Sequence, residues 1–144
     1  AGKKMAQLRP DALVLDIMLP RRNGLDVQRW NMLHPEAPPR LSYIETCLRD
    51  HDGPVIAATD YIKLYADQVR AFIPSRHYSV LGTDGFGRSD TREKLRGFFE
   101  VNRHYVAVAA LRALADQEVL PQSQAAQAIK KYGIDPEKPN PTTV

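Results

Sequence analysis

Cysteine is nearly absent from the sequence, which limits the chemistry that the chain can carry. Cys47 is the single cysteine among 144 residues, so no disulfide can form within the chain and no cysteine-based metal site can be built. A reducing, cytoplasmic setting fits this composition. Long apolar runs are also missing. None approaches the roughly 18 residues that a membrane-spanning helix needs, so we expect no membrane partner.

An excess of charge of one sign is lacking as well. The chain has 20 Lys and Arg residues against 17 Asp and Glu residues, a formal net charge of +3. Nucleic-acid binding needs a local basic patch, and the basic residues are scattered, so we expect no nucleic-acid partner. The histidines are widely dispersed, and no two of them have the short spacing of a zinc site. They are His34, His51, His77 and His104.

Three short apolar runs are typical of buried strands, and helical patterns lie between them. The candidate strands are residues 12–19, 54–59 and 78–82. The candidate helices between them are 24–33, 41–48 and 60–73. A strand, a helix and a strand in this order predict a βαβ unit. We therefore predict an α/β fold with a short, mostly parallel sheet of about three to four strands.

The segment 60–73 gives the clearest of these helical patterns. Its apolar residues fall at helical spacing and form one stripe. They are Ile62, Tyr65, Val69 and Phe72. Asp60, just before them, is predicted to be the N-cap.

The C-terminal third is predicted to be helical. Asp90 and Glu93 have the spacing of a capping box, with Asp90 as the cap. The stretch 105–115 contains one charged residue, Arg112, so we expect a deeply buried helix there. A last helix over 123–132 is predicted to end at Gly133. Residues 135–144, with three prolines, are expected to form an extended tail.

Four long strings resemble one enzyme family. They are Gly-Leu-Asp-Val-Gln-Arg-Trp-Asn-Met-Leu-His-Pro (24–35), Ala-Thr-Asp-Tyr-Ile-Lys-Leu-Tyr-Ala-Asp-Gln-Val-Arg (58–70), Val-Leu-Gly-Thr-Asp-Gly-Phe-Gly-Arg-Ser-Asp-Thr-Arg (80–92) and Ile-Lys-Lys-Tyr-Gly-Ile-Asp-Pro (129–136). In this order they are similar to the C-terminal domain of bacterial homodimeric pyruvate dehydrogenases. The resemblance implies the three-layer α/β fold of the transketolase-superfamily C-terminal domain.

The resemblance also implies a function that belongs to a longer enzyme. That enzyme binds thiamine diphosphate and Mg²⁺ in its N-terminal and middle domains, decarboxylates pyruvate and acetylates the lipoyl group of the acetyltransferase component. None of those cofactor or catalytic segments is present in these residues. We therefore expect this chain alone to bind no cofactor or metal and to be catalytically inactive. Its expected partners are the other domains of the parent enzyme, the homodimer mate and the acetyltransferase component.

The first residues resemble something else. The string Arg-Pro-Asp-Ala-Leu-Val-Leu-Asp-Ile-Met-Leu-Pro (9–20) is similar to the phosphoacceptor strand of a response-regulator receiver, with Asp16 at the phosphoacceptor position. On this interpretation a receiver-like segment, 1–23, is joined near 24–27 to a dehydrogenase-like domain, 24–144. A receiver phosphorylated on Asp16 is the alternative function, although the acidic pair that would hold Mg²⁺ beside it is missing. A dehydrogenase strand at 12–19 would also explain the apolar run.

The glycine-rich loop 82–90 has two interpretations. It lies between a predicted strand and a predicted helix, where an anion can bind, but its spacing is not that of a dinucleotide or P-loop motif. The favoured interpretation is a turn-rich contact loop in which Arg88 pairs with Asp84 or Asp90. The candidate contact residues are Trp30, Asp84, Phe86, Arg88 and Asp90.

Overall fold

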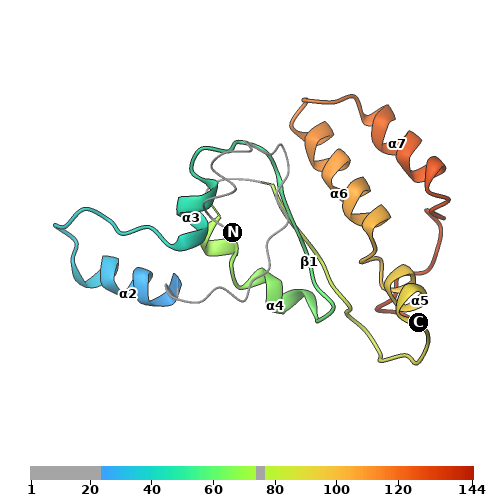
Figure 1. Ribbon diagram of the computed structural model, residues 1–144, viewed down its shortest axis with the longest axis horizontal. Helices are drawn as coiled ribbons and strands as arrows, with labels where there is room; N and C mark the ends of the chain where they lie inside the picture. Colours follow the sequence, from blue (N-terminus) through green and yellow to red (C-terminus); the bar gives the residue numbers. More distant parts are fainter. Residues whose placement is uncertain (1–23, 74–76) are drawn as a thin grey trace.

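The computed structural model describes residues 24–73 and 77–144 (Figure 1). Its elements are α2 (Gly24–Leu33), α3 (Tyr43–Leu48), β1 (Val55–Ala58), α4 (Lys63–Asp67), the 3-10 turn η1 (Arg70–Phe72), β2 (Tyr78–Leu81), α5 (Arg92–Phe98), α6 (Arg103–Asp116) and α7 (Gln122–Lys131). The strand predicted at 12–19 lies outside the described residues.

A parallel pair of strands forms the centre of the fold. Val55 of β1 lies opposite Tyr78 of β2, and Ala58 lies opposite Leu81. The strands predicted at 54–59 and 78–82 are therefore confirmed, and so is their parallel arrangement. Figure 1 shows α3 and α4 on one side of the pair and α6 with α7 on the other. The described residues thus form a small α/β domain in three layers.

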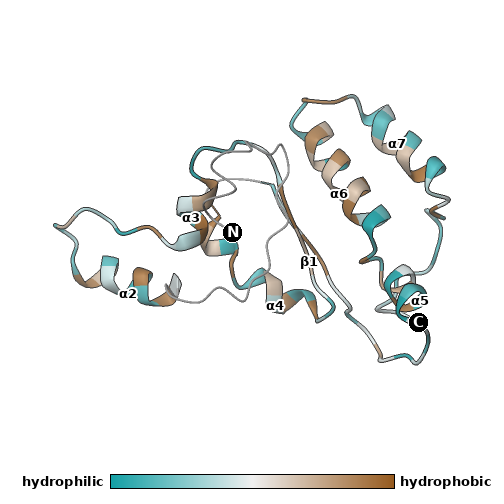
Figure 2. Ribbon diagram, in the orientation of Figure 1, coloured by the Kyte–Doolittle hydropathy of each residue, from teal (hydrophilic) through white to brown (hydrophobic). Residues whose placement is uncertain are grey.

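The core gathers around these two strands. Its buried residues come from α3, β1, α4, β2 and the turn before β2. They are Leu48, Val55, Ala57, Ala66, Ile73 and Tyr78. Apolar residues accordingly colour the strand pair brown in Figure 2. Tyr78 reaches across the core, where its hydroxyl donates to the carbonyl oxygen of Ala66 (2.7 Å). Burial raises the pKa of Tyr78 to about 12.

The predicted helix over 60–73 is shorter than expected, and Asp60 does not cap it. The helix α4 begins at Lys63 after an N-cap at Ile62 that makes no side-chain cap hydrogen bond. The remainder of the segment forms the 3-10 turn η1. The prediction for Asp60 was wrong because Arg96, distant in sequence, binds its carboxylate.

The N-terminus of α5 also differs from the predicted capping box. Thr91 is the N-cap, and its hydroxyl accepts from the amide of Lys94. Asp90 instead accepts from the amide of Thr91 (2.7 Å). A complete capping box is present in α3, where Ser42 and Glu45 bond each other's backbone amides. That capping box was not among the features predicted from the sequence.

The C-terminal third is helical as predicted, with two corrections. Only Ala113 and Ala115 of α6 are buried, so the expected deep burial of 105–115 is wrong. Within the described chain, α6 packs on β1 and α7, which leaves much of its apolar surface half-buried. The tail 135–144 is not simply extended, since Thr143 bonds back to Asn140 in a turn (2.9 Å).

Candidate interaction site

The segments that follow β1 and β2 are bonded to each other at the carboxyl edge of the sheet. The amide of Thr83 donates to Tyr61 O (2.8 Å), and the Thr83 hydroxyl donates to Asp60 O (2.9 Å). The Lys63 amide donates to Asp84 Oδ1 (2.8 Å). Gly82 allows this close approach, because a Cβ atom there would lie 2.7 Å from Lys63 N. The two segments therefore form one fixed platform.

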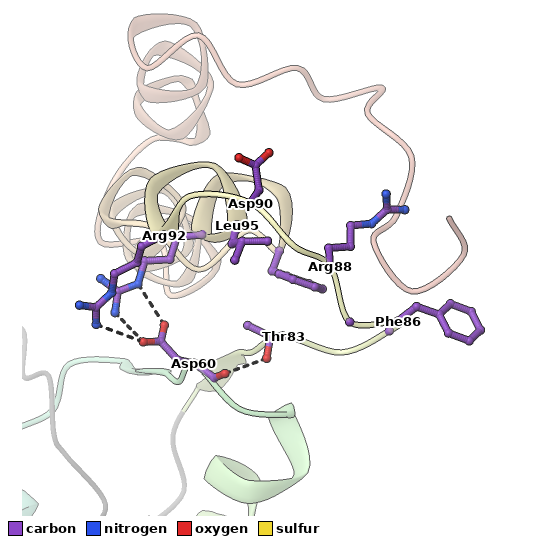
Figure 3. A pocket seen from close by; sticks show the side chains of 11 residues that line it. Asp60, Thr83, Phe86, Arg88, Asp90, Arg92 and Leu95 are labelled. Atoms are coloured by element: carbon purple, nitrogen blue, oxygen red, sulfur yellow. Dashed lines mark hydrogen bonds and ion pairs between the residues drawn. The ribbon is translucent and has the colours of Figure 1, made fainter.

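An ion pair joins this platform to α5, as Figure 3 shows. Arg96 donates two hydrogen bonds to the Asp60 carboxylate, from Nε to Oδ1 (3.0 Å) and from Nη2 to Oδ2 (2.7 Å). Arg92 approaches the same carboxylate at 3.5 Å. The hydrogen bonds from Arg96 hold the pKa of Asp60 below its usual range. Asp60 thus joins the end of β1 to α5.

A pocket of about 470 Å³ lies between the glycine-rich loop and α5. Figure 3 shows Thr83 and Leu95 on opposite sides of it and Phe86 pointing away from it. Its lining is partly apolar and partly charged. The lining side chains include Leu95, Phe99, Asp60, Asp90, Arg88, Arg92 and Arg96. A cavity of this size falls within the range of small-molecule or side-chain pockets.

The structure corrects the expected partners of Arg88. Asp84 pairs with Lys63 at 3.7 Å, and Asp90 pairs with Lys94 at 3.6 Å. The guanidinium of Arg88 lies over the ring of Phe98, 4.3 Å from its centroid. The predicted Arg88 pairs are therefore wrong, because lysines closer to each carboxylate bind it instead.

The C-terminal tail contacts both the end of α5 and the glycine-rich loop. Lys138 Nζ donates to the carbonyl oxygen of Phe98 and pairs with Glu100 at 3.2 Å. Gly85 has a φ of +109°, and a Cβ atom there would lie 2.6 Å from Pro141 O. Pro141 itself is buried. The loop is therefore held by the tail on one side and by the segment after β1 on another.

Trp30 is not part of this site. It lies on α2, and Figure 1 places α2 and α5 at opposite ends of the described molecule. The His34 ring stacks on Trp30 with centroids 4.4 Å apart, and the Arg40 guanidinium lies 3.6 Å from its ring centroid. Asn31 fixes the following loop by accepting from the Arg40 amide (2.8 Å). Trp30 therefore anchors its own helix and loop.

A row of exposed apolar residues beside the loop was not predicted from the sequence. Ile62 and Tyr65, predicted to share an apolar stripe with the buried Phe72, are 53% and 48% exposed. Neighbouring Tyr61 and Leu64 are each 68% exposed. The helical spacing of these apolar residues does indicate an apolar surface. It does not indicate whether other residues of this chain bury that surface.

Metal binding, membrane spanning and phosphorylation of Asp16 were also considered for the sequence, and the first two concern the described ranges 24–73 and 77–144. There, no group of His, Cys, Asp or Glu could hold a metal ion. No helix among the same residues is long and apolar enough to cross a membrane. Asp16 lies outside the described residues, so its phosphorylation stays a prediction.

Comparisons with known proteins identify the chain's relatives. Residues 19–102 match the family model described as the transketolase-like TK C-terminal domain. The pyruvate dehydrogenase E1 component of Pseudomonas aeruginosa is 63% identical over 121 residues, which are 84% of this chain and 14% of that protein. The Escherichia coli K12 protein of the same name is 52% identical over 120 residues, 83% of this chain and 13% of the relative.

The chain thus spans about one seventh of the length of the relatives that it matches, 14% of the Cupriavidus necator pyruvate dehydrogenase E1 component, for example. That relative is 58% identical over 123 residues, 85% of this chain. The family-model match and these identities agree with the strings that first indicated the resemblance. The chain belongs to the transketolase-like C-terminal domain family, as the C-terminal domain of a pyruvate dehydrogenase E1 component.

Proposed function

We propose that this chain is the non-catalytic packing and assembly part of a pyruvate dehydrogenase E1 component. One observation carries the proposal. The chain is 63% identical to a relative named as that component, yet covers 14% of its length. A stretch that short supplies one domain of the enzyme, whose role is to pack against the other domains and the homodimer mate.

The activity that we propose for the whole enzyme is the decarboxylation of pyruvate and the transfer of the acetyl group to the lipoyl group of an acetyltransferase component. This reaction belongs to pyruvate metabolism downstream of glycolysis, in the cytoplasm. Thiamine diphosphate supplies the carbanion chemistry when bound, with Mg²⁺. The described residues do not fit that metal, since none of their acidic, His or Cys groups cluster into a site. We therefore assign no catalytic step to them.

Two surface elements support a role in contacts. The loop 82–90 is exposed from Gly85 to Asp90, yet hydrogen bonds of Thr83 and Asp84 and the Gly85–Pro141 packing hold it in place. Trp30 is fixed between neighbours on the exposed helix α2. An exposed element that is already ordered loses little entropy when a partner binds.

A graft into a relative tests the proposal. In the Pseudomonas aeruginosa E1 component, the stretch that matches this chain is replaced by this chain's own residues, and a second variant lacks the stretch. We expect the graft to be a dimer with pyruvate decarboxylation close to that of the unmodified enzyme, and the deletion to lose both. Sedimentation velocity and pyruvate turnover provide the readouts. A deletion variant that stayed dimeric and active would overturn the proposal.

A further inference from the structure

We propose that an aromatic edge on this chain docks against an acidic face of another domain of the parent polypeptide. The aromatic edge consists of Tyr61, Ile62, Leu64, Tyr65 and Phe86. This inference rests on the proposed function, and it goes further by naming the surface and the chemistry of its partner.

Exposure of large apolar side chains is the first observation. Phe86 is 77% exposed, Tyr61 and Leu64 are each 68% exposed, and Ile62 is 53% exposed. The rings of Tyr61 and Tyr65 contact each other, with centroids 5.6 Å apart. Single exposed apolar residues are ordinary, but a group of them marks an interaction surface.

The second observation is that these side chains stand on a fixed backbone. The segment that carries Tyr61 and the loop that carries Phe86 are joined by the bond from Thr83 N to Tyr61 O (2.8 Å). The bond from Lys63 N to Asp84 Oδ1 (2.8 Å) joins them again. The backbone that carries Tyr61 and the base of the loop that carries Phe86 are thus ordered before a partner arrives, which lowers the entropic cost of docking.

Charge next to the aromatic edge indicates what faces it. Among the described residues, Arg88 pairs with no carboxylate and has the Phe98 ring as its contact. Arg92 shares Asp60, 3.5 Å away, with Arg96, which already binds both carboxylate oxygens. The carboxylates of Asp84 and Asp90 pair with Lys63 and Lys94. Asp60 is therefore the one carboxylate that binds guanidiniums at this site among the described residues, and Arg88 is left without one. A facing surface that presents carboxylates complements this excess of positive charge.

The excess of positive charge beside the aromatic edge argues against a second copy of this chain as the partner that covers the edge. In a two-fold symmetric contact a patch faces itself, so the arginines would oppose one another. A different domain of the parent avoids this repulsion. The chain covers 14% of the Pseudomonas aeruginosa relative, so most of that polypeptide remains available to cover the edge. The adjoining pocket of about 470 Å³ could receive one of its side chains.

Hydrogen exchange in the isolated chain and in the graft described above tests the docking. Among the described residues, the amides of Gly85, Phe86, Gly87 and Arg88 donate to no acceptor, so they should exchange fast in the isolated chain. We expect exchange across 84–88 to slow by about tenfold or more in the graft. Equal rates in a dimeric, active graft would overturn this inference and leave the proposed function standing.

Substitutions give a second readout. Tyr61→Ser with Phe86→Ser should leave the melting temperature of the isolated chain nearly unchanged, because these side chains are exposed there. A separate variant, Arg92→Gln, should do the same, because it removes one charge while Arg96 keeps both of its hydrogen bonds to Asp60. In the graft, each should speed thermal inactivation by about tenfold. Val119→Ser is the matched control, an exposed apolar residue (63%) away from the edge, and it should be neutral in both settings. Neutral edge variants in a stable graft would contradict the inference.

Two further outcomes separate the alternatives. An unsubstituted graft that fails to assemble would overturn the proposed function and this inference with it. The isolated chain should sediment as a monomer. If the isolated chain is instead a dimer, and Phe86→Ser dissociates it, the aromatic edge binds a second copy of this chain. That result would overturn the inference that an acidic face of another domain covers the edge.

Discussion

At the scale of single residues, burial sets the acid–base behaviour of Tyr78. Its side chain is 8% exposed, and its hydroxyl donates to Ala66 O (2.7 Å). Burial raises the pKa of Tyr78 to about 12, whereas a tyrosine in an unfolded chain titrates near its ordinary value of about 10. Over that range the folded state keeps a proton that the unfolded state has lost.

This difference predicts how stability depends on pH. The contribution of Tyr78 to the free energy of unfolding is fully present below about pH 10 and is lost as the pH rises towards about 12, by on the order of 2 kcal/mol. Tyr78→Phe should remove this part of the dependence, whereas Tyr61→Phe, at an exposed tyrosine, should keep it. Urea unfolding at about pH 9 and about pH 11.5 measures the difference. An unchanged dependence in Tyr78→Phe would contradict the argument.

At the scale of elements, close contact of two backbone segments holds the loop after β2. A Cβ atom at Gly82 would lie 2.7 Å from Lys63 N and 2.8 Å from Tyr61 O. Both are backbone atoms of the other segment, so they cannot move aside as a flexible side chain can. Gly87 offers a matched position, because a Cβ atom there meets nothing within 4 Å.

We expect Gly82→Ala to lower the free energy of unfolding by about 1–3 kcal/mol, as overpacking does. Gly87→Ala should change it by less than about 0.5 kcal/mol. Urea unfolding of both variants beside the unmodified chain provides the comparison. Equal stability of the two variants would show that the platform is not held by this contact.

The same scale shows what sequence patterns could predict. The runs at 54–59 and 78–82 predicted β1 and β2 because buried strands leave a simple apolar signature. The cap at Asp60 was misassigned because Arg96, 36 residues away in sequence, binds its carboxylate. The cap at Asp90 was misassigned because the next residue, Thr91, is also a capping type and caps α5 itself, while Asp90 accepts from the Thr91 amide. Local patterns thus located the elements, but their first residues depended on a contact distant in sequence at Asp60 and on a choice between two adjacent capping residues at α5.

The site was predicted less completely than the fold, for a related physical reason. The loop 82–90 was identified from its glycines, and the structure does place it at the carboxyl edge of the sheet. The partners of Arg88 were wrong, and the exposure of Tyr65 was unforeseen. A helical apolar stripe indicates a surface that needs cover, but does not say whether its own chain provides it.

At the scale of the whole molecule, the described residues leave apolar surface exposed, and we propose that other domains of the parent enzyme cover it. The helix α6 has Ala113 and Ala115 as its buried residues, although its sequence predicted deep burial. The aromatic edge is exposed as well. Burial of apolar area supplies most of the free energy that opposes chain entropy. The isolated chain should therefore be less stable than the same residues within the longer enzyme.

The strands provide the measurement of that difference. The amides of Val55 in β1 and of Thr59, the residue after β1, bond across the strand pair. They lie in or beside the core, so in a small domain they exchange chiefly when the whole domain unfolds. We expect them to exchange at least about tenfold more slowly in the graft than in the isolated chain, which is about 1.4 kcal/mol of added stability. Residues around Val119, exposed in the chain, should show no such change. Equal rates for the strand amides in both settings would mean that the small three-layer core is sufficient by itself, and that the other domains dock on it without stabilising it.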